Sequence, residues 1–375
     1  MRGLAETIAE LGQRGKTRTR VSRGGEGAEL IEVKGFGFNP GALKMLSYVP
    51  QRLAPGAALV VVLHGCTQQA TAYASDAGWI TLAERFGFAL LAPEQNSANN
   101  PNRCFNWFEP GDISRDLGEA ASIQSMVKHM VRAHDLDCDR VFVTGLSAGG
   151  AMTAVMLSVY PETFAAGAVV AGLPFGMANN VQEAFAAMQG RRAGTALGSL
   201  VDQAAPTPRR KPRLAIWHGQ ADGTVASSNA QALALQWTQY HQLPQQPGEV
   251  HTRGGWSRSV WRAEDGQAVV EMNLLSGLGH GTPLAAGGDD PIGEVAPFML
   301  EAGVSSSLEI ARFWGLAPSE PASQSELWRE VGDGPEQARA AGGLGQSIMA
   351  SVAPHVPANI QRVISTALTS AGLMR

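Results

Sequence analysis

Short apolar runs alternate with amphipathic stretches over most of this chain. The apolar and β-branched runs predict strands at residues 43–49, 59–63, 88–92, 140–144, 167–171, 213–218 and 269–275. Several of them are apolar throughout, as central strands covered on both faces must be. Helical patterns lie between the strands, at residues 79–86, 118–134, 149–160 and 226–240. This alternation predicts an α/β fold with a mostly parallel central sheet and helices on both faces.

The same pattern divides the chain into three parts. Residues 1–28 read as an N-terminal helix and linker, residues 29–317 as the α/β domain, and residues 318–375 as a tail with an amphipathic helix. The alternation is interrupted by residues 172–212, which contain an amphipathic segment at 181–188. We expect this stretch to form a short insertion after the sixth strand of the fold. The apolar residues of the tail share one helical face, which predicts a helix that packs onto the domain, with a docking helix for a partner or a lipid-like surface as the alternative.

The composition and charge argue against a nucleic-acid-binding or membrane-spanning protein. Of the 375 residues 44% are hydrophobic and 17% charged, and the net charge is −4, which gives no electrostatic case for a nucleic-acid partner. The longest uninterrupted apolar stretch, residues 57–63, is far shorter than the roughly 20 residues that span a bilayer, so we predict no transmembrane segment. Glu6 and Glu10 stand where a signal peptide would be apolar, which predicts a cytoplasmic location, with secretion as the alternative.

The cysteines do not form a recognisable metal-binding pattern. Cys66, Cys104 and Cys138 are too few and too widely spaced for a disulfide scaffold or a zinc site, so we predict no metal. Cys138 directly precedes a predicted strand, and we expect an ordinary buried thiol there.

A strand, a tight turn and a helix meet at the sequence Gly145-Leu146-Ser147-Ala148-Gly149. This is a GxSxG motif in the context that a nucleophile elbow requires. The turn is so sharp that the serine backbone is strained and side chains two residues to either side would collide with their neighbours. The following helix directs its N-terminal amides at developing negative charge. We therefore predict Ser147 as a nucleophile.

A serine nucleophile needs a base, and the base needs an orienting acid. Enzymes of the α/β-hydrolase fold supply them in the order nucleophile, acid, histidine. Asp222 follows the predicted strand 213–218, at the sheet edge where open α/β sheets hold their sites. Its alternative role is to cap the helix that follows. His280 lies between two glycines after the strand 269–275, which makes it the predicted base.

Acyl transfer also needs hydrogen-bond donors for the oxyanion. One is usually the amide after the nucleophile, here Ala148, and the other comes from an earlier loop. The strand 59–63 leads into His64-Gly65-Cys66-Thr67-Gln68. Position along this turn favours the Cys66 amide as the second donor, with Thr67 next in line.

Four segments together resemble the polyhydroxybutyrate depolymerase family of esterases, relatives of feruloyl and acetylxylan esterases. They are Leu63-His64-Gly65-Cys66-Thr67-Gln68, Cys104-Phe105-Asn106-Trp107-Phe108, Gly145-Leu146-Ser147-Ala148-Gly149-Gly150 and Gly279-His280-Gly281-Thr282-Pro283. The resemblance covers roughly residues 30–317 and implies an α/β-hydrolase fold. It also implies hydrolysis of carboxylic esters or polyesters without a cofactor, by the triad Ser147, Asp222 and His280.

The resemblance carries further expectations about the site. Similar secreted esterases often bridge the positions of Cys66 and Cys104, whereas cytosolic thiols are usually kept reduced, so both states remain open. Trp107, Thr67 and Thr282 are expected to contact the substrate. Thr282 stands where secreted polymer-degrading members commonly carry tryptophan, and no recognisable polymer-binding domain follows residue 317, which favours esters and oligomers over crystalline polymer. A feruloyl or acetylxylan esterase and a non-catalytic polyester-granule-binding protein are the alternatives.

Overall fold

The computed structural model describes residues 29–191, 196–287, 291–319 and 328–330. The chain divides into two compact units, Met1–Arg329 and Glu330–Arg375, and the architecture below is that of the first. The helices predicted within residues 1–28 and in the tail lie outside the described residues.

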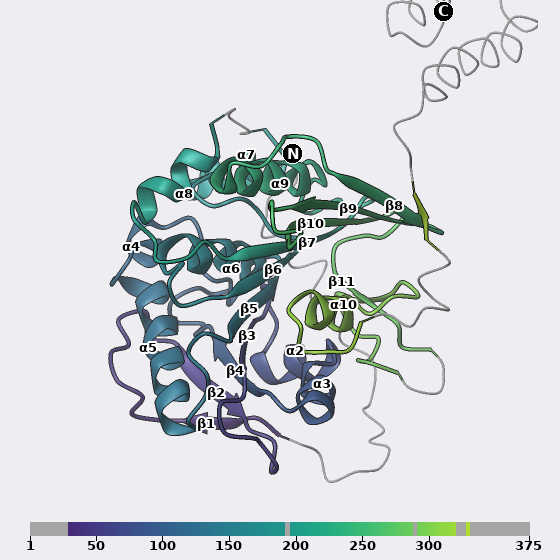
Figure 1. Ribbon diagram of the computed structural model, residues 1–375. Coiled ribbons are helices and arrows are strands. Elements are labelled where there is room, and N and C mark those ends of the chain that lie inside the picture. Colours follow the sequence, from purple (N-terminus) through teal and green to yellow (C-terminus); the bar gives the residue numbers. More distant parts are fainter. Residues whose placement is uncertain (1–28, 192–195, 288–290, 320–327, 331–375) are drawn as a thin grey trace, which may run out of the picture. The chain divides into compact units, whose positions relative to one another are not determined.

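A twisted sheet forms the centre of the described fold (Figure 1). Within the first unit its strands follow the order β1-β2-β4-β3-β5-β6-β7-β10-β9-β8. The segment from β4 to β10 is parallel, while β1, β2, β9 and β8 pair in antiparallel fashion at the edges. The strand bounds are β1 (Ile31–Val33), β2 (Lys44–Tyr48), β3 (Leu59–Leu63), β4 (Ala89–Glu94), β5 (Val141–Leu146), β6 (Ala166–Val170), β7 (Arg213–Gly219), β8 (Glu249–Arg253), β9 (Trp256–Arg262), β10 (Ala268–Leu275) and β13 (Arg329–Glu330), with β11 (Thr282–Leu284) and β12 (Met299–Glu301) forming a separate parallel pair.

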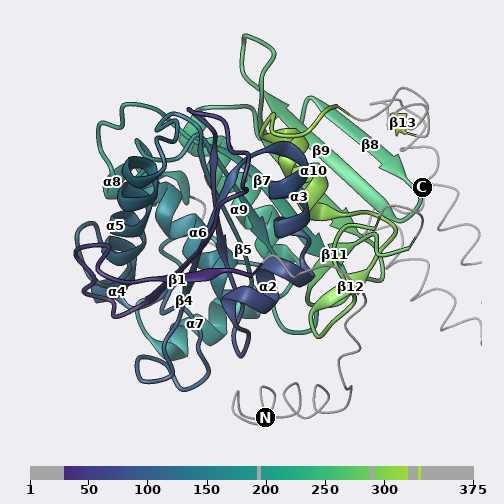
Figure 2. The same cartoon turned by 90° about the horizontal axis from the view of Figure 1, so that it is seen from below.

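Helices cover both faces of the sheet (Figure 2). One face packs against α5 (Gly118–Ala133), α6 (Ala148–Val159), α8 (Gly198–Ala204) and α9 (Ser228–His241). The other packs against α2 (Ala70–Asp76), α3 (Trp79–Phe86) and α10 (Ser306–Phe313). The short α4 (Pro110–Ile113) precedes α5, and α7 (Val181–Met188) lies in the connection after β6.

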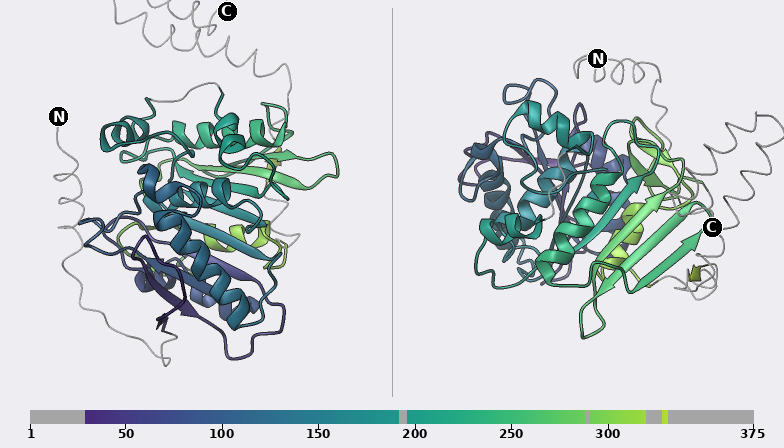
Figure 3. Two further views of the ribbon diagram at one scale, coloured as in Figure 1. Left: turned by 90° about the vertical axis from the view of Figure 1, so that its left-hand side faces the viewer. Right: turned by 90° about the horizontal axis from the view of Figure 1, so that it is seen from above.

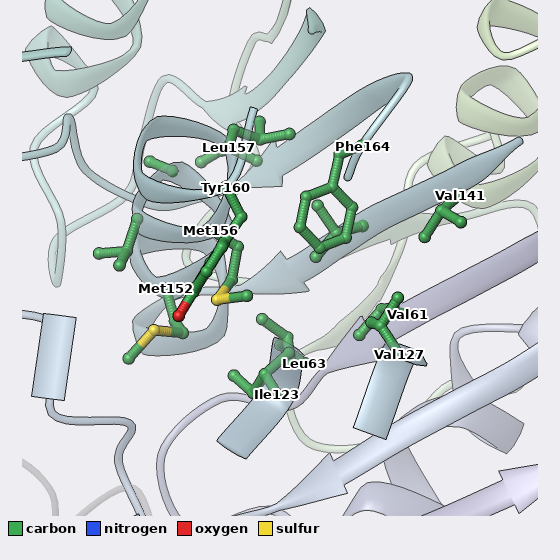
Figure 4. Close-up of a cluster of buried hydrophobic side chains, with 14 of the residues drawn as sticks. Val61, Leu63, Ile123, Val127, Val141, Met152, Met156, Leu157, Tyr160 and Phe164 are labelled. Carbon is green, nitrogen blue, oxygen red and sulfur yellow. The ribbon is translucent and has the colours of Figure 1, made fainter. Parts of the chain in front are cut away.

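The two faces have separate hydrophobic cores because side chains alternate along each strand. In β3, Leu59, Val61 and Leu63 point into the core beneath α5 and α6, whereas Val60 and Val62 join the core beneath α2 and α3. Figure 4 shows part of the first core, in which Val61 and Leu63 of β3, Ile123 and Val127 of α5 and Met152 of α6 belong to one cluster of buried side chains. All five β3 side chains are fully buried, as their continuous apolar run predicts.

The predicted central strands and helices are present, with ends shifted by a few residues. The predicted insertion, residues 172–212, follows β6 and contains α7 and α8. The hairpin of β8 and β9, which extends the sheet beyond β10 in Figure 3, was not predicted. Its signal is the pair Gly254-Gly255 between two alternating segments, a typical two-residue hairpin turn. His251 lies on β8.

The prediction for Cys138 was wrong. Its thiol is free and exposed, not buried. Cys138 lies in the turn that precedes β5, where its neighbours Asp139 and Arg140 are exposed as well, and the buried side chains of β5 begin at Val141.

Candidate active site

The turn from β5 to α6 holds Ser147 in a strained conformation. Its backbone angles, φ 57° and ψ −116°, lie in a region that residues other than glycine rarely adopt. A Cβ on Gly149 would lie 2.2 Å from the carbonyl oxygen of Leu63, and one on Gly145 would lie 2.4 Å from that of Gly149. The two glycines are therefore required because the backbone of α6 packs directly on the ends of β5 and β3.

Ser147, His280 and Asp222 form one hydrogen-bonded relay at the carboxyl ends of β5, β10 and β7. His280 Nε2 lies 2.9 Å from Ser147 Oγ, and His280 Nδ1 lies 2.7 Å from Asp222 Oδ2. A carboxylate only accepts hydrogen bonds, so Nδ1 carries the proton and Nε2 is free to accept the serine hydroxyl. These residues are 133 and 58 positions apart in sequence, and the parallel strands bring them together at one sheet edge.

Hydrogen-bond donors at both oxygens of Asp222 stabilise the ionised form of this carboxyl group. Its Oδ1 accepts from the amides of Thr224 at 2.8 Å and Val225 at 2.9 Å. His218 Nε2 lies 3.3 Å from the other oxygen, Oδ2, which His280 also contacts, and the side chains of His218 and Asp222 are fully buried. Burial would by itself raise the pKa of Asp222, but the hydrogen bonds from His218, His280 and the Val225 amide, together with the charge of His280, outweigh it and hold the pKa well below its ordinary value.

The turn after β3 lies beside the serine, and its amides are not equivalent. The Thr67 amide donates to the carbonyl of Asn102 at 2.7 Å, and the Gln68 amide donates to the carbonyl of Gly65. Within the described residues, the amides of Cys66 and Ala148 have no protein acceptor. Of the two donors weighed for this turn, Cys66 is therefore the one that is free.

A disulfide joins Cys66 to Cys104. It links the turn after β3 to the loop that carries Trp107, which were the two segments expected to approach each other. Both cysteines are in the wall of the pocket above Ser147.

The pocket above Ser147 has a volume of about 190 Å³ and a predominantly apolar wall. Of the residues predicted to contact substrate, Trp107 and Thr67 line it. Thr282 does not, because it lies in β11 with its side chain 1% exposed. The apolar wall consists of Trp107, Phe108, Leu146, Val181, Ala184, Phe185, Met188 and Phe298, and the polar wall includes Thr67, Gln68, Asn100, Asn102 and Thr224.

Part of this wall was not predicted from the sequence. Val181, Ala184, Phe185 and Met188 follow the spacing i, i+3, i+4, i+7, so one stripe of α7 faces the pocket. The amphipathic pattern of residues 181–188 was a signal for a helix, but not for what its apolar face would meet. The contact of His218 with Asp222 was also missed, although the four-residue spacing across the end of β7 was visible.

The described residues offer little for a metal ion. One group of potential ligands, Asp137, Cys138 and Asp139, lies in the exposed turn before β5 and outside the pocket wall. In the described part of the chain, no helix has both the length and the apolar character that a membrane crossing needs.

A parallel sheet flanked by helices, with a strained serine between strand and helix and a histidine and carboxylate on later strand ends, defines an α/β-hydrolase. Comparison with known proteins agrees with this class. The acetyl xylan esterase from Aspergillus awamori superposes with a TM-score of 0.64 at 24% identity, over 77% of this chain and 99% of that structure.

Comparison of the sequence with known proteins identifies a family within this fold class. Residues 46–255 match the family described as esterase PHB depolymerase, a span that includes Ser147 and Asp222 and ends before His280. Poly(3-hydroxyalkanoate) depolymerase C of Paucimonas lemoignei is 42% identical over 76% of this chain and 70% of its own length. Feruloyl esterase B of Talaromyces funiculosus is 30% identical over 68% of this chain and 74% of its own. Acetylxylan esterase A of Emericella nidulans is 31% identical over 67% of this chain and 84% of its own length.

The chain belongs to the PHB depolymerase family of esterases. It is a serine esterase, that is, a carboxylic ester hydrolase.

Proposed function

We propose that this esterase hydrolyses hydroxyalkanoate esters, as polyester or as its oligomers, with Ser147 as nucleophile, His280 as general base and acid, and Asp222 as the orienting carboxylate. The observation that carries the proposal is the unbroken relay of 2.9 Å and 2.7 Å at the floor of an apolar pocket. Trp107 and Thr67 lie in the wall of that pocket and are proposed to contact the substrate. Thr282, buried in β11, is not part of the proposal.

The proposed reaction has two acyl-transfer steps. His280 Nε2 takes the proton from Ser147 Oγ as that oxygen adds to the ester carbonyl, and the amides of Cys66 and Ala148 bind the oxyanion. The tetrahedral adduct collapses, the C–O bond to the alcohol breaks, and His280 returns the proton to the leaving alcohol. Water then attacks the acyl-enzyme in the same way and releases the acid and the free serine.

Two observations support the substrate class. The relative that is 42% identical is a poly(3-hydroxyalkanoate) depolymerase. The pocket wall carries no carboxylate, lysine or arginine, so it fits a neutral ester better than a charged one.

The nucleophile is tested by Ser147→Ala. Loss of the serine in a triad of this type leaves about one part in 10⁶ of kcat, so hydrolysis of p-nitrophenyl butyrate is expected to vanish. Ser158→Ala is the matched control, because Ser158 lies on the same helix with its hydroxyl bonded to the carbonyl of Ala154 at 2.8 Å. A Ser147→Ala variant that keeps even about a tenth of the activity contradicts the assignment.

The substrate class is tested with a panel of hydroxybutyrate oligomers, methyl ferulate and acetylated xylan, with the products identified by mass. We expect the highest kcat/KM on the oligomers. Preference for ferulate or acetylxylan would assign the function of the fungal esterases that are 30% and 31% identical. Binding to polyester granules without hydrolysis of any ester would instead support the non-catalytic alternative.

The disulfide provides information about the cellular compartment in which the protein resides. Disulfides persist in oxidising compartments, so the Cys66–Cys104 bridge supports the secreted alternative over the cytoplasmic location that the sequence favoured.

A further inference from the structure

The small sheet of β11 and β12 places two residues of the pocket side by side (Figure 2). Its strands are parallel, with Thr282 opposite Met299, so the residues that precede the two strands lie at the same end of the pair. His280 lies just before β11 and Phe298 just before β12. The amide of Thr282 donates to the carbonyl of Phe298 at 2.7 Å. The pair therefore holds the segment after His280 against Phe298.

The ring of Phe298 packs against the imidazole of His280. The two ring planes are 80° apart and their centroids are separated by 6.2 Å, an edge-to-face arrangement typical of aromatic pairs. Both side chains line the pocket above Ser147, and Phe298 is half-buried. Trp107 and Phe108, in the same wall, pack edge to face on one another. Phe298 thus forms the part of the wall that adjoins His280.

The backbone of Phe298 is strained. Its φ of 66° lies in the left-handed region, which glycine adopts freely and bulky side chains rarely adopt. A Cβ on Gly281 would lie 2.6 Å from the carbonyl oxygen of Phe298, so the contact with the histidine segment also restricts that neighbour. Strained residues persist where the surrounding structure holds them, and they cluster at functional sites. A phenylalanine where the backbone favours glycine indicates that the ring itself has a function.

The proposed reaction determines which part of the ester lies beside His280. Its Nε2 takes the proton from Ser147 and returns it to the leaving alcohol, so the alcohol oxygen has to come within hydrogen-bond reach of Nε2. The group attached to that oxygen then extends along the wall next to His280, which is where Phe298 lies.

We propose that Phe298 is a specificity-determining residue for the alcohol part of the ester, and that its ring contacts a branched apolar alcohol. This role rests on the proposed function, in which His280 protonates the leaving alcohol. In a hydroxyalkanoate chain the alcohol part is the next hydroxyacyl unit, whose alkyl branch is on the carbon that carries the ester oxygen. That branch is neutral and apolar, so an aromatic ring beside the histidine fits it.

Three esters separate the alcohol part from the acyl part. Ethyl butyrate and 2-pentyl butyrate differ only in the alcohol, whereas ethyl butyrate and ethyl octanoate differ only in the acyl chain. In Phe298→Ala we expect kcat/KM for 2-pentyl butyrate to fall about tenfold relative to that for ethyl butyrate, because loss of the contact with one or two methylene groups is worth this much. The ratio of ethyl octanoate to ethyl butyrate is expected to stay within about twofold of the wild-type ratio. Each ratio compares two substrates of one preparation, so the folded fraction cancels.

Phe313→Ala is the matched control. Phe313 is also half-buried, but it lies on α10 outside the pocket wall, with the guanidinium of Arg213 over its ring at 4.7 Å. Both substrate ratios are expected to match those of the wild type in this variant. A merely structural role for Phe298 would lower kcat/KM for all three esters equally and leave both ratios unchanged, and this result overturns the proposal. A fall in the acyl ratio in place of the alcohol ratio overturns it as well.

A structure of the wild-type protein tests the same contact without a substitution, and decides the matter if Phe298→Ala does not fold. A p-nitrophenyl phosphonate that carries a methyl and a 2-pentyloxy group loses p-nitrophenolate to Ser147, and the 2-pentyloxy group then stands in for the alcohol. We expect carbon atoms of that group within about 4.5 Å of the Phe298 ring. A 2-pentyloxy group packed on α7, away from Phe298, contradicts the proposal.

The outcomes for Phe298 and for the proposed function are distinguishable. Esterase activity remaining in Ser147→Ala would contradict the proposed function itself. Inactive Ser147→Ala together with an unchanged alcohol ratio in Phe298→Ala removes only the role of Phe298.

Discussion

At the scale of single residues, the site depends on backbone atoms as much as on side chains. Ser147 has a positive φ of 57°. The close contacts of Gly145 and Gly149 with neighbouring backbone atoms restrict the turn from β5 into α6 to this conformation. Its amide donates to the carbonyl of Val170 at 2.9 Å, which ties the turn to the adjacent strand β6. The strain is therefore held by contacts on both sides of the turn.

Gly149 provides a test of that packing. In Gly149→Ala the new Cβ would lie 2.2 Å from the carbonyl oxygen of Leu63 and 2.6 Å from that of His64, and both are backbone atoms that cannot turn aside. We expect the free energy of unfolding to fall by about 2 kcal/mol or more, since overpacking costs this much even where side chains can adjust. Esterase activity is expected to fall as the serine moves.

Gly111→Ala is the control, because a Cβ at Gly111 meets no atom within 4 Å. Chemical denaturation of both variants and of the wild type measures the difference. Equal stability of Gly149→Ala and wild type would contradict the close packing of α6 on β3.

At the scale of elements, segments from four places in the chain build the pocket. The turn after β3 and the loop with Trp107 are joined by the Cys66–Cys104 disulfide. Helix α7 supplies a stripe of four side chains, and Phe298 comes from the segment before β12. The central strands carry Ser147, Asp222 and His280, and these connections form the wall of the pocket.

Helix α7 is expected to limit the size of the acyl or polyester group. Ala184 is a small side chain in the pocket wall, so Ala184→Phe should fill space that longer esters use. We expect kcat/KM for p-nitrophenyl octanoate to fall about tenfold or more relative to p-nitrophenyl acetate, because steric exclusion of a few methylenes is worth this much.

Gln182→Phe is the control on the same helix, since Gln182 is exposed and outside the pocket wall. The ratio of the two kcat/KM values measures the effect independently of enzyme concentration. An unchanged ratio in Ala184→Phe would show that long esters bind away from α7.

At the scale of the whole molecule, a buried carboxyl group links stability to pH. Glu119 is 1% exposed, and its oxygens accept hydrogen bonds from the Asn106 amide at 2.9 Å and from Gln95 Nε2. Burial, helped by the nearby charge of Asp112, raises the pKa of Glu119 from 4.5 to about 8. The folded protein therefore binds this proton more tightly than the unfolded chain does.

The sign of the resulting pH dependence follows from proton linkage. Stability from Glu119 is full below the ordinary pKa of 4.5 and is lost as the pH rises to about 8, because only the unfolded chain releases the proton in this interval. The free energy of unfolding should fall by roughly 1 kcal/mol per pH unit there. Glu119→Gln carries no titrating proton and should lack this contribution.

Urea unfolding at several pH values within that interval measures the two slopes. Glu264→Gln, at an exposed position in the turn between β9 and β10, is expected to keep the slope of the wild type. Identical slopes for Glu119→Gln and the wild type would mean that Glu119 is ionised throughout the interval.

Much of the fold and the site was predictable from local patterns. The apolar run of β3 and the GxSxG turn are each encoded within a few residues, because burial on both faces and a sharp strand-to-helix turn restrict the local sequence strongly. Asp222 and His280 were predictable from their positions after strands, since all parallel strands end at the same sheet edge. The hairpin of β8 and β9 was missed because β8 is only half buried and polar residues interrupt the apolar pattern of both strands.

The sequence by itself determined the succession of strands and helices along the chain, the sharp turn at Ser147, and the positions of Asp222 and His280 after predicted strands. The tertiary structure decided which distant segments meet: Cys66 with Cys104, His218 with Asp222, His64 with Gln95, and one face of α7 with the pocket. It also decided that Thr282 points inward and Cys138 outward. Local patterns are set by the backbone and by burial within a few residues, whereas the partner of a side chain depends on how the whole sheet and its connections pack together.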